Sequence, residues 1–182
     1  MFKQIYLLPI ALTIMSCSDN NPIATDANKW TIFSSSFEAN GKPDLGEWMI
    51  HNQVADSQVT FSNDVVTGNG LWAIKLVSKS NGFSSIETKM GINPTDSLTN
   101  YIITYWAKGI GMTASSISSS TNFKIVFAHG VHFNSNSWQL HADTIFKQGK
   151  GFDSLSISLS TSFLDSMSIA YFDNVQVVGI KQ

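Results

Sequence analysis

Alternation of apolar and polar residues with a period of two is the feature of this sequence that most constrains its fold. In the clearest example, Leu155, Ile157 and Leu159 alternate with serines along residues 154 to 160. Successive side chains of a β-strand point to opposite faces, so this pattern predicts a strand with one buried and one solvated face. No stretch after residue 30 keeps a helical period for long, and Gly, Asn, Ser and Pro separate the apolar runs. The sequence therefore predicts an all-β chain.

Several other runs are rich in β-branched and aromatic residues, which favour strands. Residues 101 to 109 are typical of a central strand, and residues 169 to 178 are typical of the last strand. The Ser-rich segment 115 to 120 is predicted to be a solvated loop. Many short antiparallel strands separated by turns favour a β-sandwich or a barrel. Further strands are predicted at residues 30–33, 48–50, 54–66, 71–77, 84–90, 123–128 and 138–146.

The composition fits a folded domain and argues against a nucleic-acid partner. The chain has 182 residues, of which 43% are hydrophobic and only 13% are charged, so it can bury a core. Its formal net charge of -2 does not provide the clustered Lys and Arg that phosphate binding needs. Aromatic residues make up 12% of the chain, and aromatic surfaces suit flat, neutral ligands.

Residues 1 to 16 have the three parts of an export signal. Lys3 supplies the positive start, residues 5 to 14 form an apolar run, and small and polar residues follow. The apolar run is shorter than the ~20 residues that a helix needs to span a bilayer. We therefore expect an exported protein whose leader does not cross the membrane.

The end of this leader, Ile14-Met15-Ser16-Cys17, resembles the lipobox of bacterial lipoproteins. The resemblance implies that Cys17 is acylated and becomes the mature N-terminus, which anchors the chain to a membrane without crossing it. Cys17 is the only Cys of the chain, so it cannot form an internal disulfide. The alternative is an ordinary secretory signal with an incidental Cys.

Residues 17 to 29 are mostly polar after the Cys and are predicted to be a flexible tether. The start of this tether resembles the export tag of surface lipoproteins in Gram-negative bacteria that gather glycans. The resemblance implies a chain anchored to the outer membrane by lipid and exposed at the cell surface. The folded domain is then expected to occupy residues 30 to 182.

Several pieces of this domain occur in an order that resembles the jelly-roll carbohydrate-binding modules with the galactose-binding-like fold, of the kind found in families four, nine and twenty-two. The resemblance covers residues 30 to 180 and implies an antiparallel β-sandwich that binds glycan without cleaving it. The pieces are Phe37-Glu38 followed by a turn and Trp48, Gly70-Leu71-Trp72-Ala73-Ile74-Lys75-Leu76, residues 101–109, Trp138 before a strand, and Tyr171-Phe172-Asp173-Asn174-Val175.

Asp173 interrupts the apolar pattern of the last strand, and a buried acid costs free energy unless it is paired, hydrogen-bonded or bound to a metal. The family resemblance implies that Glu38 and Asp173 share a structural calcium ion that joins the first and last strands. Backbone carbonyls near Ser36 and the Asn69-Gly70 loop would complete the ligands, because Ca²⁺ takes about six to eight oxygens. The alternative is that Asp173 caps backbone N–H groups while Glu38 faces water.

Exposed aromatic residues are the candidate glycan contacts, because sugar rings pack their C–H faces on aromatic rings. Trp106 lies on the face of its strand opposite Tyr101, Ile103 and Tyr105, which look like core, so Trp106 is a candidate for an open sheet face. Phe83 follows a turn where the resembling modules often place a stacking aromatic. The polar candidates are Glu87, Gln139 and His141, and the residues expected to pack in the interior are Trp48, Trp72 and Trp138.

No catalytic constellation is evident in the sequence. The acids are scattered, mostly in turns, and no Ser lies in a nucleophile elbow. The pairs His129/His132 and His141/Asp143 do not match the spacing of a cupin-type metal site. We therefore expect a glycan-binding protein that is not an enzyme. The alternatives are a structural or assembly lipoprotein that holds a protein partner on the same sheet face, and a divergent jelly-roll glycanase or lyase.

Overall fold

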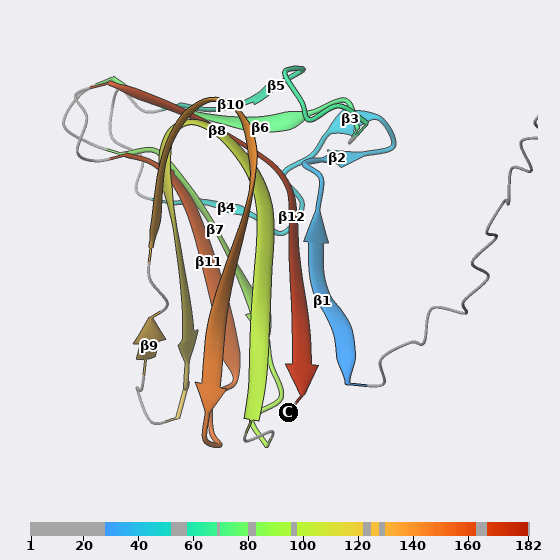
Figure 1. The fold of residues 1–182 in the computed structure, drawn as a ribbon, viewed down its shortest axis with the longest axis vertical. Coiled ribbons are helices and arrows are strands. Elements are labelled where there is room, and N and C mark those ends of the chain that lie inside the picture. The colour runs from blue at the N-terminus through green and yellow to red at the C-terminus, as the bar shows by residue number, and fades with distance from the viewer. Residues whose placement is uncertain are drawn as a thin grey trace, which may run out of the picture.

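A computed structural model describes residues 28–51, 58–68, 70–79, 83–95, 98–121, 125–127, 130–162 and 167–181 (Figure 1). These residues form twelve strands and contain no helix, in agreement with the all-β prediction. The described part of the chain accordingly has no helix with the length and hydropathy of a membrane span. The predicted leader, Cys17 and most of the tether lie outside the described residues.

Ten strands belong to one antiparallel sheet, and two short strands pair in a separate hairpin. The hairpin strands β2 and β3 join at Asn40 and Gly41, whose positive φ values of 54° and 71° suit a tight turn. The strands are β1 (Lys29–Ser35), β2 (Glu38–Ala39), β3 (Lys42–Pro43), β4 (Met49–His51), β5 (Gln58–Ser62), β6 (Ala73–Ser78), β7 (Ser85–Gly91), β8 (Leu98–Ser118), β9 (Ile125–Phe127), β10 (Val131–Gln148), β11 (Ser154–Thr161) and β12 (Ser168–Lys181).

The large sheet bends over itself into two facing layers. The front layer has the order β10-β8-β12-β1, and the back layer has the order β4-β7-β11-β8. The strand β8 belongs to both layers, because residues 99–109 pair with β12 and residues 111–118 pair with β11. Figure 1 shows β8 and β10 arching together over the top of the molecule, where β12 pairs with β6 and β6 pairs with β5.

Gly109 lies where β8 leaves the front layer. Its φ is +94°, and a Cβ atom there would lie 2.0 Å from the carbonyl oxygen of Ile169 on β12. Only glycine tolerates both that conformation and that close approach of two backbones. The long strand can therefore bend at Gly109, where its partner changes from β12 to β11.

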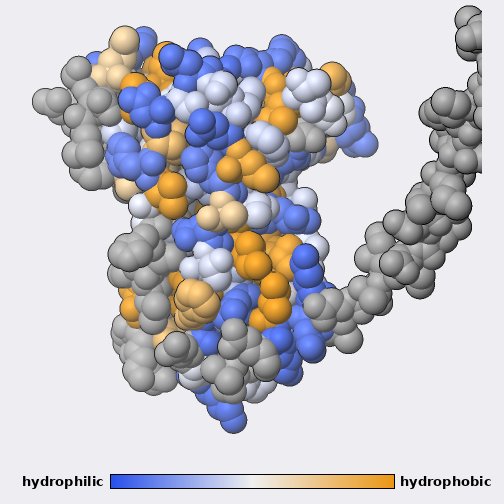
Figure 2. Space-filling model, in the orientation of Figure 1, coloured by the Kyte–Doolittle hydropathy of each residue, from blue (hydrophilic) through white to orange (hydrophobic). Residues whose placement is uncertain are grey.

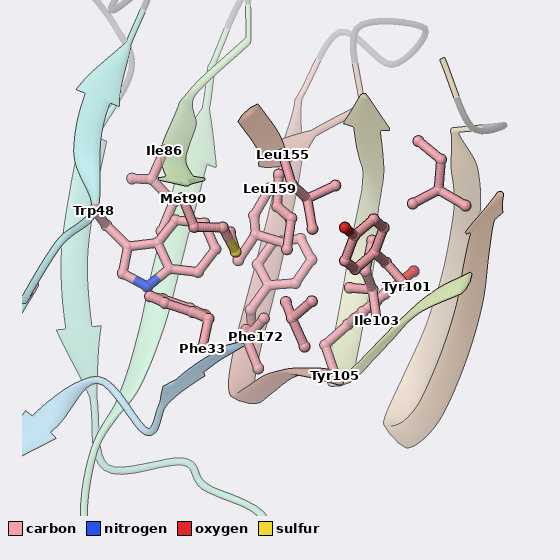
Figure 3. Packing of buried hydrophobic residues seen from close by; sticks show 14 of the residues in the cluster. Phe33, Trp48, Ile86, Met90, Tyr101, Ile103, Tyr105, Leu155, Leu159 and Phe172 are labelled. Carbon is pink, nitrogen blue, oxygen red and sulfur yellow. The ribbon is translucent and has the colours of Figure 1, made fainter. Parts of the chain in front are cut away.

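The hydrophobic core lies between the two layers (Figure 3). Tyr101, Ile103 and Tyr105 point into it from β8, as their alternation predicts, and each is at most 2% exposed. They face Leu155, Ile157 and Leu159, whose predicted buried face is confirmed at 0–1% exposure. Figure 3 shows Trp48 and Phe33 closing one end of this core, with their rings 5.6 Å apart and edge to face.

The prediction of a solvated loop at residues 115 to 120 is wrong. The strand β8 continues through Ser118, and Ser115 is only 4% exposed. Pairing with β11 satisfies the backbone along this segment, and tertiary pairing of this kind overrides the weak preference of Ser for strands. The predicted burial of Trp48 is confirmed at 3% exposure, whereas Trp72 is half-buried and its indole N–H donates to the carbonyl of Gly41 at 3.2 Å.

Candidate functional site

Asp173 lies at a β-bulge of the last strand. The register between β12 and β8 shifts between Asp173 and Gln176, and Asn174 has a φ of 46°. A bulge of this kind re-aims a side chain. The Asp173 carboxylate is 0% exposed and accepts hydrogen bonds from the backbone N–H groups of Asn174 at 2.8 Å and Val66 at 3.4 Å.

Glu38, the first residue of β2, contacts the same segment of the chain as Asp173. Its carboxylate accepts a hydrogen bond of 2.7 Å from the backbone N–H of Leu71. Gly70 lies against this carboxylate, since a Cβ atom there would be 2.7 Å from Glu38 Oε1. Residues 66 to 71 therefore contact both acids, although Asn69 lies outside the described residues.

The electrostatics of this acid pair are unfavourable in the absence of a cation. Burial, with a smaller contribution from the nearby charge of Glu38, raises the pKa of Asp173 from 3.8 to about 6 against the lowering effect of the two backbone hydrogen bonds. A buried carboxylate with a like charge nearby is costly when ionised. A cation is the group that would relieve this cost.

The donor set fits a calcium ion. Glu38 and Asp173 supply carboxylate oxygens, and the lack of a side chain at Gly70 lets the backbone of this segment lie against the Glu38 carboxylate. No three His, Cys, Asp or Glu side chains cluster in a metal-binding arrangement within the described ranges, so any further ligands would be backbone carbonyls or water. Calcium accepts such oxygen ligands, whereas zinc prefers nitrogen and sulfur.

A second group of side chains lies on the outer surface at the top of the front layer. Tyr171 on β12 is paired in register with Lys75 on β6 and with Lys108 on β8. Residues directly opposite each other in antiparallel strands point to the same face. The Lys108 ammonium lies 4.7 Å from the centre of the Tyr171 ring, and the Lys75 ammonium lies 5.6 Å from it.

Trp138 and Asp64 extend this group. Trp138 lies in the part of β10 where the register with β8 shifts, and its ring is 6.3 Å from that of Tyr171, edge to face. Its indole N–H donates to the Asp64 carboxylate at 3.3 Å, and Asp64 also forms an ion pair with Lys108. The hydrogen bond from Lys108 lowers the pKa of Asp64. We call Lys75, Tyr171, Lys108, Trp138 and Asp64 the arch cluster.

A cavity of about 320 Å³ opens beside the arch cluster. Lys108 and Tyr171 form part of its wall. Ser135 and Asn136 provide hydroxyl and amide groups, and Met167, which is 64% exposed, provides an apolar rim. We call this cavity the arch pocket. It combines an aromatic wall with polar groups, which is the composition of a site for a small polar ligand with flat apolar faces.

The outer face of the back layer is different in character. Glu87 borders a shallow depression of about 160 Å³ whose floor consists of small residues of β8 and β11. Glu87 and Lys89 point outward, whereas Ile86 and Met90 are buried, as their alternation predicts. Among the side chains that the structure describes, no aromatic residue lines this depression. Its lining consists of Glu87, Ala114, Ser115, Ser116, Ser156 and Ser158.

The structure does not bring the five predicted ligand residues together. Glu87 and the half-buried Phe83 belong to the back layer, on or just before β7. Trp106 is half-buried on the outer face of the front layer, two residues before Lys108 and opposite Leu140 and Asp173. Gln139 is exposed on β10 beside Trp138.

His141 lies on the inner side of β10. Its ring stacks on that of Tyr105 at 5.2 Å with an interplanar angle of 9°, and it also packs against Phe133 at 5.5 Å. Burial lowers the pKa of His141. These contacts give His141 a packing role at the edge of the core, away from the arch pocket.

Sequence reasoning missed the arch cluster. Trp138 was expected to pack in the interior, and Tyr171 was considered only as part of the last strand. The sequence signal was present in the alternation of Tyr171 with the buried Ala170 and Phe172, which places its side chain on the outer face. The registers that align Tyr171 with Lys75 and Lys108 are visible only in the structure.

No protein-family model and no curated protein matches this sequence. Solved structures do match its fold. The xylan-binding domain CBM22-1 of Xyn10C from Paenibacillus barcinonensis superposes with a TM-score of 0.56 at 9% identity, over 84% of this chain and 96% of that one. The CBM22-1–GH10 modules of a Clostridium thermocellum xylanase, solved with xylohexaose, match with a TM-score of 0.55 at 14% identity, over 81% of this chain and 28% of that one.

A third match is the enzymatically active domain of tailspike protein 4 from bacteriophage CBA120, with a TM-score of 0.54 at 15% identity, over 78% of this chain and 21% of that one. At such identities the likeness defines the fold and leaves the ligand open. The resemblance to jelly-roll carbohydrate-binding modules is therefore confirmed as a resemblance of fold. The chain has the antiparallel jelly-roll β-sandwich of the family-22 xylan-binding modules.

Proposed function

We propose that the chain binds a glycan without cleaving it and that the glycan occupies the arch pocket. The observation that carries this proposal is the placement of Tyr171 beside an open cavity of about 320 Å³ whose wall also carries amide, hydroxyl and ammonium groups. A sugar ring needs an aromatic or apolar surface for its C–H face and polar groups for its hydroxyls. The shared fold with xylan-binding modules supports the same ligand class.

The chemistry of the pocket favours binding over hydrolysis. Glycoside hydrolysis generally uses two carboxylates on opposite sides of the scissile bond. None of the described residues that line the arch pocket is an acid. The neighbouring Asp64 is held by Lys108 and Trp138, so its oxygens are committed to the arch cluster.

A glycan-binding assay tests this proposal directly. Tyr171→Ala removes the aromatic wall and is expected to weaken binding at least tenfold in isothermal titration calorimetry, with ligands taken from a glycan array. Phe146→Ala is the matched control, because Phe146 is an aromatic residue that is 56% exposed on β10 and does not line the arch pocket. Equal glycan affinities of the Tyr171→Ala variant and the unmodified chain would mean that the glycan does not bind in the arch pocket.

We also propose that Glu38 and Asp173 hold a structural calcium ion. The support is the buried carboxylate of Asp173, whose pKa is raised by burial and by Glu38, together with the contacts of residues 66 to 71 with both acids. When bound, the ion would supply positive charge that ties β12 to the segment after β1. It would stabilise the fold and take no part in glycan chemistry.

Lipid anchoring at Cys17 is the third part of the proposal, and it rests on the lipobox-like sequence alone. Replacing Cys17 with Ala is expected to move the protein from the membrane pellet to the soluble fraction and to abolish incorporation of labelled palmitate. Retention of the variant in the pellet would contradict lipid anchoring. If the Cys17→Ala variant is released as expected, proteinase accessibility on intact cells tests whether the anchored domain faces outward from the outer membrane.

A second candidate function is supported by the outer face of the front layer. Figure 2 shows hydrophobic residues gathered in a band over this face. Leu140 and Phe146 on β10 are 59% and 56% exposed, and Ile102 lies between them on β8. A flat apolar face of this kind suits a protein partner. A chain that binds no glycan, and whose association with another envelope protein is lost in Leu140→Asp, would favour this candidate.

A further inference from the structure

We propose that the arch pocket selects an acidic glycan, one that carries a carboxylate or a sulfate group. The inference rests on the proposed glycan binding and names the ligand class. It follows from the charge of the arch cluster, which contains two ammonium groups and one carboxylate within the described residues.

Lys108 is the cation that a ligand in the arch pocket would meet, because it lines the cavity wall. Its side chain is only 16% exposed, whereas that of its partner Asp64 is 50% exposed. A poorly hydrated ammonium attracts anions more strongly than a solvated one, since the local dielectric constant is lower. Lys108 also lies over the rings of both Tyr171 and Trp138, at 4.7 and 5.4 Å.

Lys75 adds the second positive charge. It is half-buried on β6, and its ammonium lies 5.6 Å from the centre of the Tyr171 ring. Within the described ranges, no carboxylate lies within ion-pair distance of it. The two lysines therefore lie near the Tyr171 ring, on the two strands that flank β12. The surface on which a sugar would stack is therefore also positively charged.

The acids around this cluster do not cancel that charge. Asp64 remains ionised, because its hydrogen bond with Lys108 lowers its pKa, and it balances one of the two lysines. Asp173 lies two residues from Tyr171 on β12, but its carboxylate is shut from solvent and accepts from the N–H groups of Val66 and Asn174. The arch cluster therefore keeps one net positive charge, which an anionic ligand can neutralise.

The test compares glycans that differ only in charge. Oligogalacturonate is titrated against its methyl ester, and chondroitin sulfate against desulfated, carboxyl-reduced chondroitin, using the full-length protein in isothermal titration calorimetry with 1 mM calcium. We expect at least one acidic glycan to bind at least tenfold more tightly than its neutral counterpart. The oligogalacturonate arm tests a carboxylate alone, and the chondroitin arm tests a carboxylate and a sulfate together. We expect the preference to shrink as NaCl rises from 50 to 300 mM, since exposed charges are screened.

Two lysine variants test whether the preference for acidic glycans arises in the arch cluster. Lys75→Gln is expected to lower affinity for the acidic glycan about fivefold and to leave affinity for the neutral counterpart unchanged. Lys89→Gln is the matched control, because Lys89 is exposed on the outer face of the back layer. Equal losses in the two variants would assign the effect to the overall charge of the protein and would overturn the inference.

The remaining outcomes separate this inference from the proposed function. Equal binding of the acid and the neutral form, or binding of neutral glycans alone, overturns the acidic preference and leaves glycan binding intact. Binding of no glycan in any arm, charged or neutral, overturns both.

Discussion

The arch cluster and the acid pair Glu38/Asp173 share a strand but differ in how charge is held. Tyr171 and Asp173 are two residues apart on β12, and Asp173 is opposite Trp106 while Tyr171 is opposite Lys108. In the arch cluster opposite charges meet near solvent, with Asp64 half-exposed. At Asp173 two like charges are close and one of them is fully buried. The first arrangement suits a ligand that binds reversibly, and the second suits a structural ion that remains bound.

The largest effect is expected at the buried acid in the metal-free protein. A pKa raised from 3.8 to about 6 corresponds to a cost of about 3 kcal/mol when Asp173 is ionised. Between these two values the folded state binds more protons than the unfolded state, so stability falls as the pH rises through about 6. Asp173→Asn keeps the shape of the side chain and removes this charge, so the free energy of unfolding of the variant should exceed that of the unmodified chain by about 3 kcal/mol at pH 7.5 and by little near pH 4.

Urea unfolding in EDTA at several pH values measures this difference. Subtracting the free energy of unfolding of the unmodified chain from that of the variant at each pH cancels the titration of all other groups. A difference that does not change between pH 4 and pH 7.5 would mean that the Asp173 carboxylate is not destabilised in the folded protein.

Calcium should produce the next largest effect. A ligand that binds only the folded state at about 100 times its dissociation constant stabilises it by about 2.7 kcal/mol, which corresponds to roughly 5 to 10 °C in Tm for a domain of this size. Scanning calorimetry with calcium and with chelator should show this shift for the unmodified chain and for the control Glu87→Gln. The shift should be absent in Asp173→Asn and Glu38→Gln. The same Tm with calcium and with chelator would contradict the site.

The alternating strands and the unusual position of Asp173 could be predicted from the sequence for physical reasons. A period of two in Leu155, Ile157 and Leu159 depends only on local geometry, and their burial at 0–1% follows from it. Asp173 could be recognised because an acid is costly in an apolar strand. The expected proximity of Glu38 came from the family resemblance, and the effect of Glu38 on the pKa of Asp173 agrees with it.

The arch cluster could not be predicted because it depends on register between strands that are distant in sequence. Lys75, Lys108 and Tyr171 align only because β6, β12 and β8 are neighbours with a particular offset, and a shift of one residue would turn Tyr171 inward. The sequence also predicts that the central strand ends at Gly109. The structure shows instead that β8 bends there and continues into the back layer.

A smaller effect should distinguish short from long glycans. Trp106 lies two residues before Lys108 on the same outer face, which is about 7 Å along the strand, or roughly one sugar ring. If a glycan chain extends from the arch pocket along β8, Trp106→Ala should weaken binding of a hexasaccharide about tenfold and binding of a disaccharide less than twofold. Calorimetric titrations with the two lengths measure this, and a loss of the same size for both would place Trp106 outside the extended site.

The smallest effect should come from Asp64. Asp64→Asn breaks the ion pair with Lys108, but ion pairs near the surface contribute about 0.2 to 1 kcal/mol, so the change in stability should stay below about 1 kcal/mol. The same substitution removes the one carboxylate that balances the lysines of the arch cluster, so affinity for an acidic glycan should rise about threefold while affinity for its neutral counterpart does not change. Asp44→Asn is the control, because Asp44 is an exposed acid that hydrogen-bonds within its own turn. A fall in affinity for the acidic glycan would mean that the Asp64 carboxylate helps to position the ligand instead of competing with it for Lys108.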